Sequence, residues 1–173
     1  ERTVNPIACG SVSLFCDAGA TIVTAASSGY YTTPATAEAV TTRTSQTICE
    51  PGFACIGGVK TSCDGPGQYS DETGLAACKT APAGIKTSSD RQDTEDCPSG
   101  TFSMGGTDEC ANCAEGKYSS SSGAESCTTA STCGAGRYIK TPSTSNTDTE
   151  CENCAIGKAS AGGLNTCGAC TGE

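Results

Sequence analysis

Hydrophobic residues in this chain occur in short runs separated by polar turns, which predicts strands of about three or four residues joined by irregular loops. The strongest strand signal is the apolar stretch at residues 20–25. Helical spacing of apolar residues is nearly absent, and residues 34–40 are the one helix candidate, a turn or two starting at a proline. The pattern therefore predicts short β-hairpins and irregular loops with little helix.

One short unit recurs four times. Each copy opens with Cys, has Gly three or four residues later, an aromatic residue two after that, then Ser, and closes with Cys, except that Ala159 replaces the aromatic in the last copy. The copies are residues 63–78, 97–110, 113–127 and 154–167. We expect the Gly to form a positive-φ turn and the aromatic ring to pack over the nearby disulfide.

A second unit lies between copies of the first. Residues 84–97 and 136–151 both contain Ile-Lys-Thr, a Ser-rich polar stretch and Asp-Thr-Glu just before a Cys, and residues 29–49 form a faded third copy. Modules this small contact mainly their neighbours, so tandem repeats of them predict an elongated rod.

The N-terminal part differs because residues 17–48 contain no Cys. One interpretation is that it packs on residues 1–16 as a small β-rich module, and another is that it pairs with a second copy of the chain by strand addition. We therefore divide the chain into a β-rich N-terminal segment at 1–48, with a role in inter-subunit packing, and cysteine-rich repeats at 49–112 and 113–173.

The composition explains why the repeats need disulfides for stability. The 173 residues include 15 Cys and 22 Gly, but only five Tyr, three Phe and no Trp or His. A chain so poor in large apolar side chains cannot bury an ordinary core, and this Cys content is typical of disulfide-rich extracellular proteins. Glu1 and Arg2 lead into a polar stretch, so for a secreted protein we expect the sequence to be a mature form.

Because each unit opens and closes with Cys, we predict sequential disulfides. The pairs are Cys63–Cys78, Cys97–Cys110, Cys113–Cys127, Cys133–Cys151 and Cys154–Cys167. Cys9–Cys16 and Cys49–Cys55 extend the scheme, although spacing alone does not fix connectivity. Cys-x2-Cys pairs at 151/154 and 167/170 also come close to zinc-ribbon spacing, but the other Cys are scattered and the span is one repeat copy, which favours disulfides.

Fifteen is an odd number, so one Cys cannot pair within the chain. In the sequential scheme this is Cys170, which follows Cys167 as Cys113 follows Cys110. One interpretation is that Cys170 opens a further unit, whose partner lies in a longer precursor or a neighbouring subunit. The alternatives are an unpaired, buried Cys170 or a different odd residue among the first four Cys.

The net charge of −9 argues against nucleic acid as a partner, and no apolar run is long enough for membrane insertion. The acidic clusters at 90–96 and 148–152 are interpreted as solvated turns, since neither matches a calcium loop. Without His, no Ser-His or Cys-His pair exists, so we predict no enzyme, no metal and no cofactor. No Asn-x-Ser/Thr acceptor occurs, but O-glycans could be carried by residues 32–47, 119–122 and 141–149.

The motif at Cys110, Cys113, Gly116, Tyr118 and Ser119 resembles the cysteine-rich repeats of ephrin-receptor-like and tumour-necrosis-factor-receptor-like extracellular regions, and Asp-Thr-Glu before Cys151 is similar to the second half of such modules. With its Ser/Thr/Gly-rich filler, the chain is most similar to protist surface proteins such as ciliate immobilisation antigens and algal mastigoneme proteins. The resemblance covers residues 49–173 and implies a structural or recognition role at the cell surface.

These observations leave two functions open. The first is a structural subunit of an extracellular coat, hair or filament, built from copies of the chain. The second is the ligand-binding ectodomain of a receptor-like surface protein. Aromatic residues occur about once per repeat, as expected of packing residues rather than of a binding patch, which favours the structural function.

Overall fold

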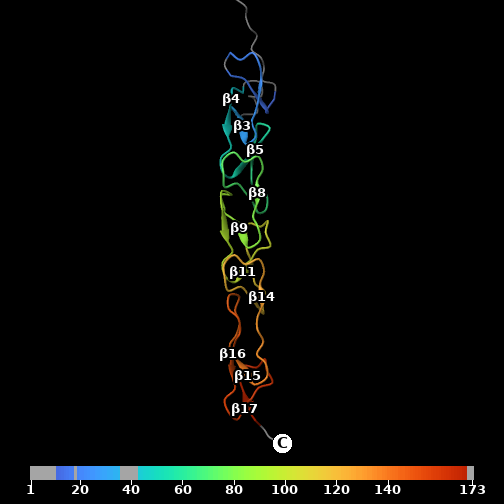
Figure 1. The fold of residues 1–173 in the computed structure, drawn as a ribbon, viewed down its shortest axis with the longest axis vertical. Helices are drawn as coiled ribbons and strands as arrows, with labels where there is room; N and C mark the ends of the chain where they lie inside the picture. Colours follow the sequence, from blue (N-terminus) through green and yellow to red (C-terminus); the bar gives the residue numbers. More distant parts are fainter. Residues whose placement is uncertain (1–10, 18, 36–42, 171–173) are drawn as a thin grey trace, which may run out of the picture. The chain divides into compact units, whose positions relative to one another are not determined.

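The computed structural model describes residues 11–17, 19–35 and 43–170 (Figure 1). In these ranges it has short strands, irregular loops and no helix, as the sequence predicts. The strands pair two by two in chain order, β1 with β2, β3 with β4 and so on, which gives nine two-stranded hairpins over the described residues. Most of the predicted helix at 34–40 lies outside the described part, and Pro34 and Ala35 are not helical.

The strands are two to five residues long. The first eight are β1 (Leu14–Phe15), β2 (Thr24–Ala25), β3 (Tyr30–Thr33), β4 (Ser45–Ile48), β5 (Phe53–Ile56), β6 (Val59–Ser62), β7 (Gln68–Tyr69) and β8 (Lys79–Thr80). The others are β9 (Ile85–Thr87), β10 (Thr94–Asp96), β11 (Thr101–Phe102), β12 (Ala111–Asn112), β13 (Lys117–Tyr118), β14 (Thr128–Thr129), β15 (Arg137–Thr141), β16 (Glu150–Asn153), β17 (Lys158–Ala159) and β18 (Gly168–Ala169).

The chain forms two compact units. One comprises Glu1–Ala81 and Thr87–Thr94, and the other comprises Pro82–Lys86 and Glu95–Glu173. Within each unit the hairpins follow one another in chain order (Figure 1). The division into residues 1–48, 49–112 and 113–173 stays a prediction.

The strand predicted at 20–25 is shorter than its apolar pattern indicated. Only β2 pairs, with Leu14 opposite Ala25 and Phe15 opposite Thr24, and Ile22 remains 73% exposed. β1 cannot extend the ladder because the Cys16 N–H donates to the Arg43 carbonyl (2.9 Å) and so leaves the hairpin. The N-terminal hairpin contacts β3 instead through the Thr32 hydroxyl, which donates to the Val12 carbonyl (2.6 Å).

A glycine immediately before the first strand closes eight of the hairpins in the same way. Each of these opening glycines has φ between +63° and +86°, a region that strains other residues. The carbonyl of each accepts a hydrogen bond of 2.8–3.1 Å from the N–H of the residue that follows the second strand. The opening glycines are Gly29, Gly52, Gly67, Gly84, Gly100, Gly116, Gly136 and Gly157.

The third residue after each opening glycine, which we call the third-position residue, forms the core with the cysteines. Seven of the eight are at most 9% exposed, and all seven are small. They are Thr32, Cys55, Ser70, Thr87, Ser103, Ser119 and Ser160. The eighth is Ile139, which is half-buried. The aromatic residue that precedes the buried Ser is only half-buried at Tyr69, Phe102 and Tyr118, so the small polar side chain occupies the centre of each module.

Two main-chain hydrogen bonds join a hairpin to the next one in the chain. In the first, the opening glycine N–H donates to the carbonyl of the following hairpin's third-position residue, as in Gly100 to Ser119 (2.8 Å). In the second, the third-position N–H donates to a turn carbonyl of the following hairpin, as in Ser103 to Ala124 (3.1 Å). Because both bonds use peptide groups, the contact between modules depends little on side-chain identity.

Candidate functional site

The cysteines predicted to pair form a series of disulfides along the described chain. The bonds are Cys63–Cys78, Cys97–Cys110, Cys113–Cys127, Cys133–Cys151 and Cys154–Cys167, with Cα–Cα distances of 5.6–5.8 Å. The second Cys of each pair lies next to or within the second strand of a hairpin, so the bond ties that strand to the segment before the opening glycine. Each loop closed in this way removes freedom from the unfolded chain.

A sixth disulfide, Cys49–Cys55, closes a much shorter loop, since its two cysteines are six positions apart in the sequence. The segment from Cys49 matches the unit from Cys97, since both have Gly at the fourth position and Gly-Gly at the hairpin turn. It is shorter, however, and has no Cys where Cys110 stands. Cys49 therefore bonds to Cys55, which takes the third position that Ser103 holds in the other module.

Two further predicted cysteines lie near the ends of the described part. Cys16 is disulfide-bonded, and its predicted partner Cys9 lies outside the described residues. Cys170 carries an exposed free thiol. Its N–H donates to the Gly157 carbonyl (3.1 Å), which is the place that Cys113 takes on Gly100 and Cys63 takes on Gly52. Cys170 thus occupies the main-chain position of a cysteine that opens the next unit.

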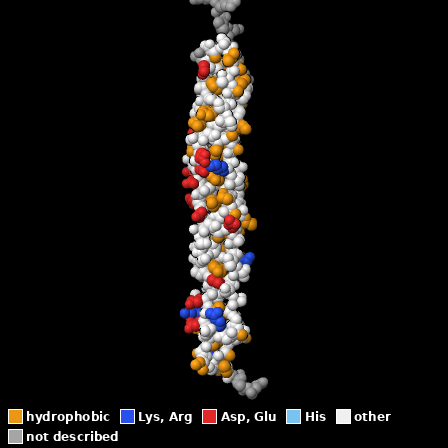
Figure 2. Space-filling view, in the orientation of Figure 1, with side chains coloured by type: hydrophobic (Ala, Val, Ile, Leu, Met, Phe, Trp, Pro, Cys, Tyr) orange, Lys and Arg blue, Asp and Glu red, His pale blue; other side chains and the backbone are white. Residues whose placement is uncertain are grey.

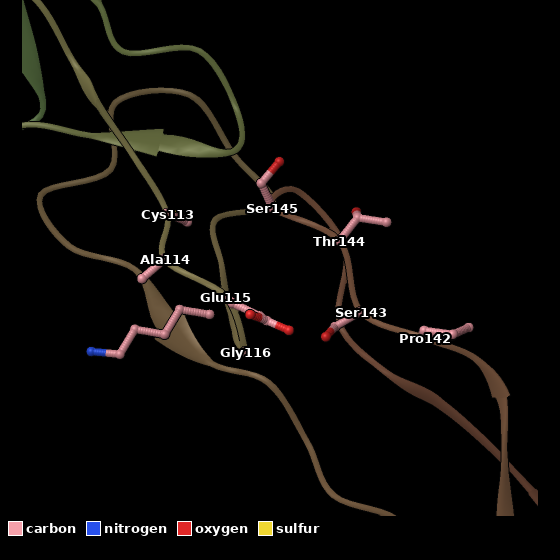
Figure 3. A pocket seen from close by; sticks show the side chains of 9 residues that line it. Cys113, Ala114, Glu115, Gly116, Pro142, Ser143, Thr144 and Ser145 are labelled. Atoms are coloured by element: carbon pink, nitrogen blue, oxygen red, sulfur yellow. The ribbon is translucent and has the colours of Figure 1, made fainter. Parts of the chain in front are cut away.

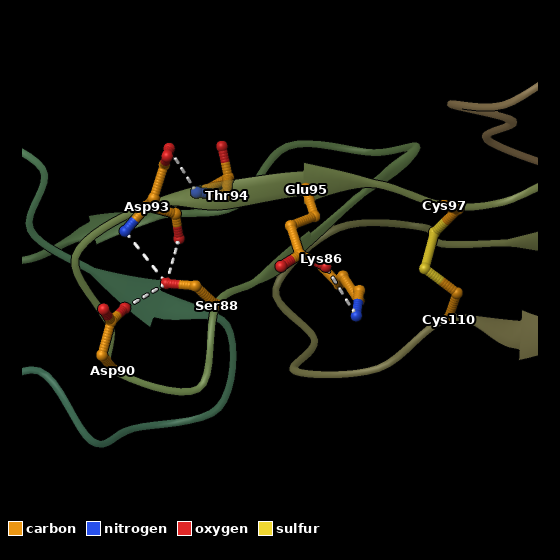
Figure 4. Close-up of polar contacts among 8 residues, drawn as sticks. All are labelled: Lys86, Ser88, Asp90, Asp93, Thr94, Glu95, Cys97 and Cys110. Carbon is orange, nitrogen blue, oxygen red and sulfur yellow. Dashed lines mark hydrogen bonds and ion pairs between the residues drawn. A yellow bond between two sulfur atoms is a disulfide. The ribbon is translucent and has the colours of Figure 1, made fainter.

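The first acidic cluster forms a tied turn between β9 and β10. The Ser88 hydroxyl donates to an Asp90 carboxylate oxygen (2.6 Å), and the Asp93 N–H donates to the Ser88 oxygen (3.0 Å) (Figure 4). The Ser88 hydroxyl and the Gln92 N–H, which both donate to Asp90, lower the pKa of that carboxyl group. These carboxylates therefore organise a turn, as expected of a polar loop.

The second acidic cluster anchors the segment before β15. The Asp148 carboxylate accepts from the Ser131 N–H (2.6 Å) and the Ser131 hydroxyl (2.7 Å). These two donors are the main reason that the pKa of Asp148 is lowered. Burial, followed by the charge of Asp148, raises the pKa of Tyr118. Asp148 thus links three separate stretches of the second unit.

Lysines pair with carboxylates on the hairpin surfaces. Lys79 contacts both Asp71 and Glu72 at 2.7 Å, and its hydrogen bonds, first to Asp71, raise its pKa. Lys140 lies 3.3 Å from Glu150 and 3.4 Å from Glu152. A third pair, Lys86–Glu95 (2.9 Å), joins β9 to β10 (Figure 4). Figure 2 shows acidic and basic side chains gathered in such small mixed groups, with hydrophobic side chains scattered between them.

One hollow in the second unit lies where the junction between two hairpins lacks one of its two hydrogen bonds. It is a groove of about 430 Å³ between residues 113–117 and residues 142–145 (Figure 3). On one side stands the Gly116 turn, and on the other the loop that follows β15. The Ser119 N–H donates to the Ser145 carbonyl (2.9 Å), but the Gly116 N–H makes no bond to a third-position carbonyl in the described part.

No group of three or more His, Cys, Asp and Glu side chains in the described ranges could hold a metal ion. Nor does the described chain contain a helix long and apolar enough to cross a membrane. No protein-family model matches the sequence, and no curated protein matches it. Its helix-free hairpins and six described disulfides are those of a small disulfide-rich protein, and abundant disulfides are typical of secreted and extracellular chains.

Proposed function

We propose that this chain is an extracellular structural protein, a subunit of a cell-surface coat, hair or filament that associates with other copies of itself and has no catalytic role. The observation that carries the proposal is the repeated main-chain junction between hairpins. The same two main-chain hydrogen bonds recur in both compact units, and small residues hold seven of the eight third positions. A protein built by repeating one self-compatible contact is suited to scaffolding.

The distribution of charged groups supports a structural role. The carboxylates of Asp71 and Asp90 bind a lysine, a hydroxyl or a main-chain N–H within their own hairpins, and Asp148 binds Ser131 in the segment before its hairpin. Catalytic carboxylates instead have their pKa values tuned by burial in a pocket, often upward. Here the pKa values of these three groups are lowered by local donors on the surface.

Electron microscopy and sedimentation of the full oxidised chain over a range of concentrations test the proposal. We expect filaments or ordered arrays, with an average mass that rises with concentration. The reduced and alkylated chain is the control and should not assemble in an ordered form. Single particles with the mass of one chain at every concentration would refute the structural function.

A second candidate, the ligand-binding ectodomain, is favoured by a surface depression of about 500 Å³ at the last hairpins. Tyr138, Asn153, Lys158 and Asn165 line it with one aromatic ring and several polar groups. A monomeric chain that binds a ligand on a glycan or peptide array, and loses it in Tyr138→Ala, would support this function instead.

A further inference from the structure

The groove beside Gly116 arises because hairpin β15–β16 departs from the repeat. Its third-position residue is Ile139, where the other hairpins have Ser, Thr or Cys. Its pairing register also shifts between Ile139 and Thr141. This junction has one of the two usual bonds, from the Ser119 N–H to the Ser145 carbonyl, and the Gly116 N–H does not bond to a third-position carbonyl in the described part.

Junctions that make both hydrogen bonds show which one the Gly116 junction lacks. Gly29, Gly52, Gly84, Gly100 and Gly136 all donate to a third-position carbonyl at 2.7–3.0 Å. Gly116 is exposed and lines the groove, whereas Gly29, Gly52, Gly84 and Gly100 are buried. The Gly116 N–H has no third-position carbonyl as its acceptor in the described residues, so it is open to a ligand in the groove.

Other polar groups in the groove complement this donor. The Glu115 carboxylate and the Ser143 hydroxyl point toward each other across the groove (Figure 3). Neither side chain has a hydrogen bond or ion pair within the described residues. The groove thus offers a main-chain donor, a carboxylate acceptor and a hydroxyl, which match the alternating C=O and N–H groups of an extended peptide.

We propose that this groove binds an extended peptide segment with small side chains from a partner chain, whose main-chain carbonyl accepts a hydrogen bond from the Gly116 N–H. The carbonyls that accept this hydrogen bond elsewhere in the described chain all belong to buried Ser or Cys residues, which favours small side chains in the bound segment. The volume of about 430 Å³ lies in the range of about 300–1,000 Å³ common for ligand sites. Lys117 and Glu115 leave the lining without net charge, which suits a neutral segment.

The test uses the full oxidised chain, labelled with ¹⁵N, and a capped, neutral peptide Tyr-Ser-Ser-Ser-Ser. This is the sequence of residues 118–122, which provides the carbonyl that Gly100 binds. We expect a saturable shift of the Gly116 amide signal and about tenfold slower hydrogen exchange there, with Gly100 and Gly136 unchanged. A peptide with Val in place of the first two Ser should bind about tenfold more weakly.

Two variants locate the site. Ser143→Tyr fills the groove and should weaken binding at least about tenfold, because the peptide must then compete with the ring. Ser121→Tyr is the matched control, an exposed serine in the turn between β13 and β14, and should bind as the unaltered chain does. Unchanged amide signals of Gly52 and Gly136 confirm that each variant is folded.

Three results would overturn the inference: no shift at Gly116 with millimolar peptide, equal binding by Ser143→Tyr, or a stronger Gly116 response to a neutral oligosaccharide than to the peptide. The inference goes beyond the proposed function and does not depend on it. If the chain binds the peptide but never assembles, the groove proposal stands and the structural function is refuted. If the chain assembles without binding the peptide, the structural function stands and the groove proposal is refuted.

Discussion

Hairpins of two kinds share one main-chain design in this protein but are held by different means. Five hairpins have a disulfide between the segment before the opening glycine and the second strand: β7–β8, β11–β12, β13–β14, β15–β16 and β17–β18. Hairpins β3–β4 and β9–β10 have no Cys between their opening glycine and the end of their second strand. Both kinds nevertheless close on an opening glycine with the same hydrogen bond.

Where the disulfide is missing, an arginine contacts the third-position threonine. Arg43, only 5% exposed, donates to the Thr32 carbonyl (2.8 Å) and hydroxyl (2.6 Å). Arg91 donates to the Thr87 hydroxyl (3.1 Å). The comparison teaches that glycine and the small third-position residue set the geometry, whereas the disulfide or the arginine adds stability to it.

Reduction of the disulfides should have the largest effect, and it should destabilise the hairpins that carry a disulfide. Each loop closed over about 15 residues contributes on the order of 3 kcal/mol in the chain-entropy model, and unfolding free energies of whole domains are about 5–15 kcal/mol. We expect the repeats at 49–173 to lose their native circular dichroism and protease resistance in reductant at 25 °C. If the reduced chain keeps both, the staples are not what stabilises these modules.

Substitution of opening glycines tests whether the close approach of neighbouring hairpins, and not the disulfide alone, determines the geometry of each hairpin. Gly84→Ala places a Cβ against the main chain of Gly123, and Gly116→Ala places one in open space, while φ is +82° and +75°. Positive φ costs Ala about 1–2 kcal/mol in both, and overlap at Gly84 adds about 1–3 kcal/mol. Native-state hydrogen exchange of the surrounding hairpins measures the difference, and equal losses would contradict the role of close approach.

Removal of the Arg43 side chain should destabilise hairpin β3–β4, which has no disulfide, and leave the disulfide-bonded hairpins unaffected. Arg43→Ala leaves the buried Thr32 hydroxyl and carbonyl without this donor, at a cost of about 1–3 kcal/mol. Exchange of the β3–β4 amides should accelerate accordingly. Arg137→Ala is the control, since Arg137 is exposed and its side chain donates, among the described residues, to the Cys151 carbonyl alone, and it should cost less than about 1 kcal/mol. Unchanged protection of β3–β4 in Arg43→Ala would show that the arginine does not replace a staple.

Acid should give the smallest effect. The pKa values of Asp90 and Asp148 are lowered in the folded chain, so their contribution to stability is present above the ordinary value of 3.8 and is lost as pH falls through the lowered values. The melting temperature should therefore decline gently below about pH 4. Asp148→Asn should flatten this decline in part, and an identical pH profile would rule out a role for Asp148.

The sequence predicted the pairing of cysteines well, because each unit carries its own opening and closing Cys next to turn residues. It did not predict which side chains form the centre. Ring size favoured the aromatic residues, yet seven of the eight third positions, where the hydrogen bonds between successive hairpins are made, hold a buried Ser, Thr or Cys. A Gly-x-x-Ser/Thr/Cys pattern, present at Gly52 and Gly100 among others, is the signal that would have revealed these positions.

Features that depend on contacts between residues distant in the sequence could not be predicted. Arg43 is 11 residues from Thr32, and no spacing rule connects them. The groove beside Gly116 requires residues 142–145 to approach from another hairpin, and its cause, Ile139 at a third position, is meaningful only once that position is known. The rod that tandem repeats suggest stays a prediction.

Because successive hairpins recognise each other through peptide groups, a duplicated copy of the gene segment for one hairpin would encode a product already compatible with both neighbours. Copy number can then grow or shrink by in-frame recombination, without matched substitutions elsewhere. Exposed positions that make no junction contact can diversify independently in each copy. The opening glycine is the same residue in all eight hairpins, and the third position is a small residue in seven of them.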